Sequence, residues 1–384
     1  MNLIDNRPNS IIFKKYSVSL DKSNYEILIG RDIITTMSQF LVEKTKDKRI
    51  LIVIDEFFRA KILDPLVQSL SDFGFSVYVH NFEAGKQNKT ISEAMKIYEI
   101  LESNDFARDS TMIAIGGGVI GDLAGFVAST YLRGMNLIHV PTTLTAMIDS
   151  SIGGKVAINF RKTVNAIGNY YHPMMNIIDL QFTDTLLERD LKAGLAEIIK
   201  CAVMCDKELF DYLNNNHIEI MDIQDNILLK IIYRAIEIKL DHVKDDVKEQ
   251  NTRLKLNYGH TLGHAIEIST GIFEEVYRHG EGVSLGMVGA AHIARDYFNH
   301  GDEIINKHEE ILQRYGLPIR VESGSIGFEG AKLREECLRN ILKDKKRKGN
   351  KLRFILPQAI GKCEIYTDIS DEFIQRAFDY LIRD

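Results

Sequence analysis

Two histidines four residues apart give this sequence its clearest chemical signal. His260 and His264 lie in the segment Leu256–Ala265, and a third imidazole follows in His279-Gly280-Glu281. In a helix this spacing places both side chains on one face, and a loop can bring the third back to them. Such a cluster can bind a metal, but the same spacing also suits two half-buried helix residues whose imidazoles bond to backbone carbonyls. The residues alone leave both interpretations open.

A carboxylate and an ammonium group lie three residues apart in a second segment. Glu197 and Lys200 belong to Leu195-Ala196-Glu197-Ile198-Ile199-Lys200. An exposed ion pair on a helix is one interpretation. The apolar neighbours predict instead that the pair is buried, and a buried charge usually needs a metal, a partner or a substrate. We therefore favour a functional role.

A glycine-rich turn follows the predicted strand Thr111–Ile115. It reads Gly116-Gly117-Gly118-Val119-Ile120-Gly121-Asp122 and leads into an apolar helix. Glycines let the backbone approach a ligand, and the first N–H groups of a helix can bind a pyrophosphate. The pattern favours a dinucleotide site, although it is not GxGxxG and any α/β protein can use glycines in a tight turn. Asp55, at the end of an earlier strand, could bind ribose hydroxyls or simply cap a helix.

A third polar cluster contains hydroxyls, an acid, glycines and a lysine. Pro141-Thr142-Thr143 ends one predicted strand, and Asp149-Ser150-Ser151-Ile152-Gly153-Gly154-Lys155 follows shortly after it. This combination is unusual for a structural loop and suits a phosphate or a sugar.

The elements that must position these residues change in type along the chain. The first part alternates short β-branched runs with amphipathic stretches, which predicts parallel strands joined by helices. The second part has apolar residues at helical spacing. We predict an α/β dinucleotide-binding domain with a parallel sheet over residues 1–181 and a mostly α-helical metal-binding and substrate-binding domain over 182–384. The predicted strands are Ile50–Asp55, Phe75–Val79, Thr111–Ile115, Leu137–Val140, Asn176–Asp179 and Leu352–Leu356, and the predicted helices are Phe58–Phe73, Ile91–Ser103, Leu186–Leu213, Asp225–Val243, Gly259–Ile268, Gly282–Phe298, Asp302–Tyr315 and Asp371–Ile382.

Composition excludes several classes of partner. The 384 residues are 45% hydrophobic and carry a net charge of −6, with a pI near 6.0. An acidic protein of this kind is not expected to bind nucleic acid or an anionic membrane.

The polar start of the chain and the lack of a long apolar run predict a cytoplasmic protein. Four cysteines without a CxxC pair are expected to be reduced, and the spacing of Cys201 and Cys205 favours core packing over metal binding.

Taken together, these segments resemble the dehydroquinate synthase family of sugar phosphate cyclases. The resemblance runs from about Ile50 to Ala377. It implies an NAD-binding domain, a helical metal domain, an active site in the cleft and a homodimer. Besides the motifs above, it rests on Tyr131-Leu132-Arg133-Gly134, Ala193–Lys200, Leu256–Glu267 and Asp344-Lys345-Lys346.

The resemblance also implies a role for each matching residue. The divalent metal, usually zinc with cobalt possible, would be held by Glu197, His260 and His279, and His264 would not be a ligand. NAD would contact Asp55, Glu83, Lys86, Gly116, Gly117, Gly118, Asp122, Thr142 and Thr143. The substrate phosphate would meet Lys155, Asn165, Asn257, His264, Lys345 and Lys346, with Arg133 contributed by the partner subunit. Asp149 and Lys200 would orient the hydroxyls and the metal ligands, and Lys239 and Arg253 would line the substrate with Asn257.

The reaction that the resemblance implies is redox-neutral and places the protein among the carbon–oxygen lyases. A substrate alcohol is oxidised with NAD, the new ketone acidifies the neighbouring C–H, phosphate leaves, the ketone is reduced again, and an intramolecular aldol step closes the ring. Lys239, Arg253 and Asn257 favour a seven-carbon keto-acid phosphate and the product 3-dehydroquinate, a step of the shikimate pathway to aromatic amino acids. Related cyclases that form 2-epi-5-epi-valiolone or 2-deoxy-scyllo-inosose are the alternative. A metal-dependent polyol dehydrogenase and an inactive binding protein are further alternatives.

Two positions depart from the family pattern. Relatives have Gly-Lys-Asn where this chain has Thr163-Val164-Asn165, so a lysine expected in the active site is Val164. Arg161 and Lys162 lie close enough in sequence for one of them to replace its charge, and the sequence does not decide whether one does. Gly282 stands where alanine is more usual.

Overall fold

The computed structural model describes residues 11–20, 23–347 and 352–384. The described chain divides into two compact units. Unit 1 runs up to residue 186 and also includes residues 239–248, and unit 2 contains residues 187–238 and 249–384.

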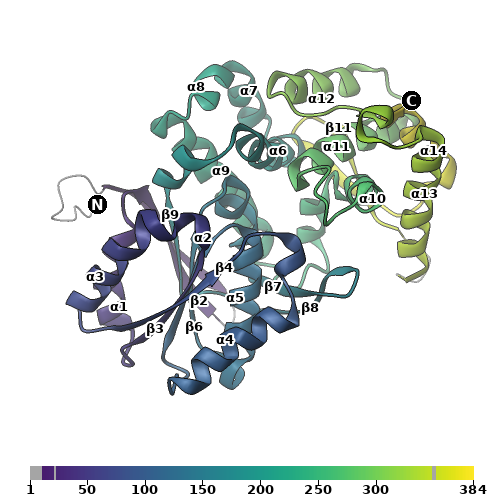
Figure 1. The fold of residues 1–384 in the computed structure, drawn as a ribbon. Helices are drawn as coiled ribbons and strands as arrows, with labels where there is room; N and C mark the ends of the chain where they lie inside the picture. The colour runs from purple at the N-terminus through teal and green to yellow at the C-terminus, as the bar shows by residue number, and fades with distance from the viewer. Residues whose placement is uncertain (1–10, 21–22, 348–351) are drawn as a thin grey trace. The chain divides into compact units, whose positions relative to one another are not determined.

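Unit 1 is built on a seven-stranded sheet with the order β1-β2-β9-β6-β5-β3-β4 (Figure 1). Only the pairing of β1 with β2 is antiparallel; every other neighbouring pair is parallel. The parallel strands therefore bring their carboxyl ends to one edge, where polar side chains can gather. The strands are β1 (Ile11–Leu20), β2 (Ser23–Arg31), β3 (Arg49–Asp55), β4 (Ser76–Phe82), β5 (Thr111–Gly116), β6 (Asn136–Pro141) and β9 (Met175–Asp179).

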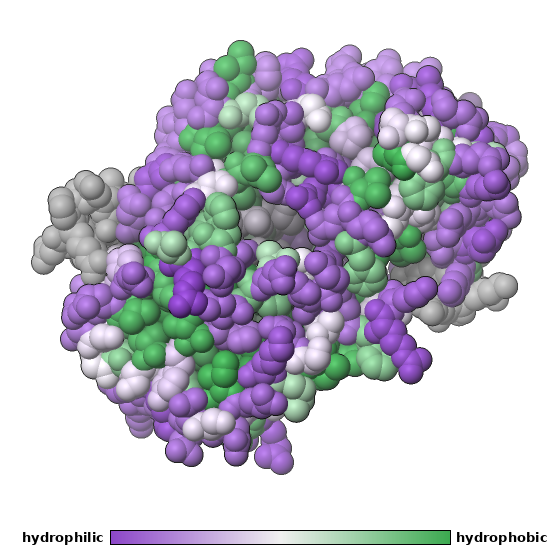
Figure 2. Space-filling model, viewed as in Figure 1, coloured by the Kyte–Doolittle hydropathy of each residue, from purple (hydrophilic) through white to green (hydrophobic). Residues whose placement is uncertain are grey.

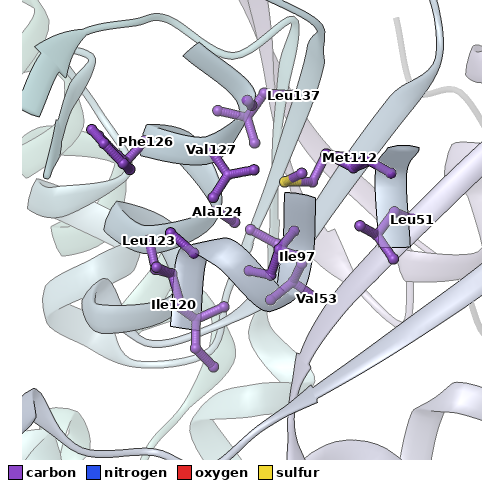
Figure 3. Close-up of a cluster of buried hydrophobic side chains, with 14 of the residues drawn as sticks. Leu51, Val53, Ile97, Met112, Ile120, Leu123, Ala124, Phe126, Val127 and Leu137 are labelled. Carbon is purple, nitrogen blue, oxygen red and sulfur yellow. The ribbon is translucent and has the colours of Figure 1, made fainter. Parts of the chain in front are cut away.

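Helices cover both faces of this sheet. Leu51 and Val53 of β3 belong to a buried cluster with side chains from α4 and α5, as Figure 3 shows. Ile50, Ile52 and Ile54 point to the other face and are also fully buried. Burial on both faces explains why the parallel strands read as continuous apolar runs. The helices of unit 1 are α1 (Met37–Lys44), α2 (Glu56–Phe58), α3 (Asp64–Asp72), α4 (Ile91–Ser103) and α5 (Gly118–Thr130).

A separate antiparallel hairpin completes unit 1. It is formed by β7 (Lys155–Phe160) and β8 (Thr163–Tyr170). Val156 and Ile158 of β7 are buried, and β7 packs against α5. Nearly all of β8 is exposed. The hairpin therefore presents one strand to solvent in the single chain.

Unit 2 is mostly helical, with two short two-stranded sheets. Val321–Glu322 (β10) pairs in parallel with Ile382–Arg383 (β13), and Phe354–Ala359 (β11) pairs antiparallel with Lys362–Tyr366 (β12). The helices are α6 (Glu188–Cys205), α7 (Lys207–Asn215), α8 (His217–Met221), α9 (Asp225–Val243, which ends in unit 1), α10 (His260–Thr270), α11 (His279–Phe298), α12 (Glu303–Arg314), α13 (Gly330–Arg347) and α14 (Asp371–Leu381).

Helices α10 and α11 approach each other at backbone distance. A Cβ atom on Gly286 of α11 would lie 1.7 Å from the carbonyl oxygen of Gly259, and one on Gly263 of α10 would lie 2.4 Å from the carbonyl oxygen of Gly282. No side chain larger than hydrogen fits at either contact. This packing brings the first turns of the two helices together, and both begin with a histidine.

The secondary structure predicted from the sequence is largely confirmed, with three corrections. The predicted helix Leu186–Leu213 is two helices, because Asp206 ends α6 and its carboxylate accepts the Leu209 N–H to cap α7. The stretch 58–73 begins as a π-helical turn, Arg59–Leu63, before α3. Strands β1, β2, β7, β8, β10, β12 and β13 and helices α1, α8 and α13 were not predicted.

The surface carries scattered hydrophobic residues among many hydrophilic ones, as the face in Figure 2 shows. All four cysteines are free thiols, as expected. Cys201 is buried, but Cys205 is exposed, so core packing explains only the first. No helix in the described residues is long and apolar enough to cross a bilayer.

Asp179 is the main polar anchor of unit 1, and its removal is predicted to destabilise the fold. This fully buried carboxylate accepts N–H bonds from Asp32, Ile33 and Ile34 at 2.7–3.0 Å. Asp179→Ala leaves these donors unpaired and should cost about 3–5 kcal/mol in the free energy of unfolding. Thr90→Ala, which removes one helix cap from α4, should cost only about 1 kcal/mol. Equal losses in urea unfolding would contradict this account.

Candidate functional site

The three histidines singled out from the sequence meet in unit 2. His260 is the first residue of α10, His264 lies one turn later, and His279 is the first residue of α11. One ring nitrogen from each lies within 4.8 Å of the others. His260 and His264 therefore lie one helical turn apart, as predicted, and the segment between α10 and α11 brings His279 back to them.

Glu197 of α6 joins this cluster. Its carboxylate is 1% exposed, and Oε1 lies 3.3 Å from His279 Nε2 and 3.9 Å from His260 Nε2. No hydrogen bond of ordinary geometry reaches Oε1 within the described residues. Lys200, also 1% exposed, places Nζ 2.6 Å from Oε2. The prediction that the Glu197–Lys200 pair is buried is thus confirmed.

These donors fit a divalent metal. A buried carboxylate oxygen without a hydrogen bond faces two imidazole nitrogens, which is the donor set of a catalytic zinc site. His260 Nδ1 lies 3.0 Å from the Tyr258 carbonyl oxygen, so it carries the hydrogen and Nε2 can offer its lone pair. His264 is more exposed and lies at the edge of the cluster.

The electrostatics of the cluster suit cation binding. Burial and the nearby Lys200 ammonium hold the pKa of His260 well below its usual value, so its imidazole is neutral. Burial would raise the pKa of Glu197, but Lys200 and the two imidazoles reverse this and hold it well below its ordinary value. Burial alone would lower the pKa of His279, yet Glu267 and Glu197 raise it to about 10. Without a metal these two carboxylates keep a proton on His279, and a bound cation would take the place of that proton.

Two further predicted residues of unit 2 lie on the short 3-10 helix Thr252–Asn257. The Arg253 side chain is 1% exposed, and Asn257 Nδ2 donates to Glu249 Oε1 at 3.0 Å. Sequence reasoning did not identify Glu249, because nothing in its local sequence distinguishes it from other surface acids. Lys345 and Lys346 lie near the end of α13, and their side chains are outside the described residues.

In unit 1 the glycine turn has the predicted form. Strand β5 ends at Gly116, and α5 begins at Gly118. A Cβ on Gly118 would lie 2.8 Å from Ser150 Oγ, so the absence of a side chain keeps the first turn of the helix accessible. Thr142 is buried, and its N–H donates to the Gly116 carbonyl oxygen at 3.0 Å. A small cavity is lined by the three glycines, His139, Pro141 and Ser150. These features fit the phosphates of a dinucleotide.

Asp122 of α5 is paired with a lysine that sequence reasoning missed. Lys89 is 4% exposed, and its Nζ lies 2.6 Å from Asp122 Oδ2 and also donates to Asn165 Oδ1. Burial raises the pKa of Asp122, and the Lys89 ammonium opposes that rise. Lys89 thus places an ammonium group beside Asn165, the residue that follows Val164 in the sequence. Lys89 was missed because it is distant in sequence from both partners.

Other predicted residues of unit 1 are less enclosed. Asp149 contacts the Lys239 ammonium. Asp55 accepts the Phe57 N–H at 3.0 Å, so it does cap a helix, and burial raises its pKa.

Several other predicted residues of unit 1 are exposed. Arg161 and Lys162 lie in the exposed turn between β7 and β8. Glu83, Lys155 and Arg133 are exposed, Lys86 and Thr143 are partly buried, and Arg133 has a positive φ of 67°.

Comparison with known proteins decides the family. The family model described as the 3-dehydroquinate synthase N-terminal domain matches residues 79–193, and the C-terminal model matches residues 194–347. The chain belongs to the 3-dehydroquinate synthase family. A 3-dehydroquinate synthase from Desulforamulus reducens is 37% identical over 354 residues, covering 92% of this chain and 96% of that protein. One from Thermodesulfovibrio yellowstonii is 38% identical over 370 residues, covering 95% and 99%.

Solved structures support the fold class predicted from the sequence. The structure of 2-epi-5-epi-valiolone synthase from Streptomyces hygroscopicus subsp. jinggangensis, with NAD+ and Zn2+ bound, matches with a TM-score of 0.83 and 25% identity, covering 94% of this chain and 98% of that one. A 2-deoxy-scyllo-inosose synthase complexed with carbaglucose-6-phosphate, NAD+ and Co2+ matches with a TM-score of 0.82, 23% identity and coverage of 96% and 100%. The predicted activity agrees with the names of the sequence relatives.

The buried Lys89–Asp122 pair leads to a prediction about stability. Lys89→Met leaves the partly buried Asp122 carboxylate without its cation, and should cost up to about 3–5 kcal/mol in the free energy of unfolding. Lys89→Met combined with Asp122→Leu should recover much of this loss. The control Lys96→Met removes an ammonium that is 62% exposed from its pair with Glu93, and should cost no more than about 1 kcal/mol. A double variant less stable than Lys89→Met would contradict the prediction.

Proposed function

We propose that this chain catalyses the 3-dehydroquinate synthase reaction, the elimination of phosphate from 3-deoxy-arabino-heptulosonate 7-phosphate followed by ring closure. The observation that carries the proposal is the buried cluster of Glu197, His260 and His279 in a chain of this family. We place the reaction in the shikimate pathway, in the cytoplasm.

The two cofactors are assigned to separate groups of residues. Glu197, His260 and His279 would hold zinc or another divalent metal, and the glycine turn with Asp122 would hold NAD. When bound, NAD exchanges a hydride with the substrate and the metal polarises its oxygen atoms. Lys200 neutralises Glu197 and keeps this carboxylate ionised in a buried site. NAD and Zn2+ bound in the valiolone synthase relative support both assignments.

Charged side chains of this chain select the substrate. Arg253 would bind the C1 carboxylate, because a guanidinium binds a carboxylate through two hydrogen bonds. Asn257 and His264 would contact the phosphate in unit 2. In unit 1, Lys155 and Asn165 would contact the substrate, and Asp149 and Lys239 hold each other in place beside its hydroxyls.

We also propose a homodimer in which Arg133 acts on the partner subunit's substrate. Arg133 and its neighbour Leu132 both have positive φ, and Leu132 is 46% exposed. Phe160, Ile167 and Tyr170 of the hairpin are 48%, 39% and 38% exposed. Such apolar exposure is typical of an interface. Sedimentation of a monomer at micromolar concentration would exclude this arrangement.

A substrate panel tests the proposed activity. Phosphate release should be fastest with 3-deoxy-arabino-heptulosonate 7-phosphate and much slower with sedoheptulose 7-phosphate or glucose 6-phosphate. Arg253→Ala should lower kcat/KM for the keto acid roughly thirtyfold to a thousandfold, since it loses a charge-assisted contact worth about 2–4 kcal/mol. Preference for a substrate without a carboxylate would point to another cyclase. Steady NADH formation with a polyol would point to a dehydrogenase.

The two neighbouring histidines of α10 should differ in metal binding. His260→Ala removes one of three proposed ligands and should abolish stoichiometric metal, whereas His264→Ala should keep the metal and lose turnover. Elemental analysis of dialysed protein measures the difference. Equal loss of metal in both variants would mean that His264 is a ligand too.

A further inference from the structure

A second buried carboxylate lies behind His279, on the side away from Glu197. We infer that Glu267 is a positioning residue that fixes the ring orientation and tautomer of His279 as a metal ligand. The inference rests on the proposed metal centre and assigns a role to a residue that the sequence motifs did not single out.

The geometry of His279 carries this inference. Glu267 is 3% exposed, and its Oε1 lies 3.2 Å from His279 Nδ1. The other ring nitrogen, Nε2, lies 3.3 Å from Glu197 Oε1. A carboxylate can only accept, so Nδ1 must carry the hydrogen that it donates to Glu267. With the hydrogen fixed on Nδ1, Nε2 is the nitrogen that would offer its lone pair to a metal bound beside Glu197 Oε1.

The two proposed histidine ligands are held by acceptors of different charge. His260 donates from Nδ1 to the neutral carbonyl oxygen of Tyr258 at 3.0 Å. His279 donates to an ionisable carboxylate instead. A carboxylate acceptor makes the imidazole a stronger electron donor through its other nitrogen. Glu267 therefore does more than orient the ring.

Gly282 provides the space that this arrangement needs. It lies one turn after His279 on α11, and a Cβ atom there would lie 2.6 Å from Glu267 Oε1 and 2.9 Å from Cδ. The glycine thus lets the Glu267 carboxylate lie directly against the first turn of α11. This contact gives a structural reason for a residue that departs from the family pattern.

The test is metal affinity, measured on the full-length protein without substrate. Purified wild type, Glu267→Ala and Glu267→Gln are stripped of metal and titrated with Co2+ or Zn2+ against a competing chelator. Glu267→Ala should weaken metal binding roughly 10- to 100-fold. Glu267→Gln still offers a side-chain oxygen to Nδ1 and should lose less. The visible absorption of bound Co2+ should change in the alanine variant and remain close to wild type in the glutamine variant.

Asp206→Asn is the matched control, because it alters another buried carboxylate of unit 2 that caps α7 and pairs with Arg234. It should lower thermal stability and leave Co2+ affinity and absorption unchanged. Wild-type affinity in Glu267→Ala would overturn the inference, as would equal losses in Glu267→Ala and Asp206→Asn. If His260→Ala keeps wild-type metal affinity, the proposed metal centre itself fails, which is a different outcome.

Discussion

The burial of Glu197 is the constraint on which the rest of the site depends. An ionised carboxylate at 1% exposure is costly unless cations or hydrogen-bond donors surround it. Lys200 supplies one charge from the same helix, and the imidazoles of His260 and His279 approach the other oxygen. Lys200 alone leaves Oε1 without a hydrogen bond. A cation among Oε1 and the two imidazoles would complete the arrangement, which is why we propose a metal site here.

The close approach of α10 and α11 makes this cluster possible. Glycine contacts at Gly259, Gly263 and Gly286 allow the backbones to touch, so the histidines that begin the two helices lie side by side. A larger residue at these contacts would clash with backbone atoms and force the helices apart. These glycines therefore position the proposed metal ligands, although they offer no ligand atom.

Sequence reasoning identified residues whose chemistry is visible in short motifs. The spacing of His260 and His264 and the apolar surroundings of Glu197 were enough to predict where they lie. It missed Lys89, Glu249 and Glu267, because each acts through a partner that only the tertiary fold brings near. Asp122 was predicted from the glycine turn, but its partner lies 33 residues earlier in the chain. The break at Asp206 was missed because apolar spacing continues across it.

Three lysines of the predicted or observed site are paired with acids. Lys200 pairs with Glu197, Lys89 with Asp122, and Lys239 with Asp149. The lysines are at most 7% exposed. Glu197 is as buried as its lysine, whereas the side chains of Asp122 and Asp149 are 17% and 28% exposed. Ion pairs that are buried seldom stabilise a protein more than apolar side chains of the same size would, so stability alone does not explain these pairs. Each pair instead holds a charged group at a defined position without leaving net charge in a poorly solvated site.

A substrate with both a carboxylate and a phosphate could then be bound by residues such as Arg253 without disturbing the groups proposed to hold the cofactors. Relatives have a lysine at the position of Val164. Its loss here changes where an ammonium group lies more than it changes the charge of the site, because Lys89 already supplies an ammonium group beside Asn165.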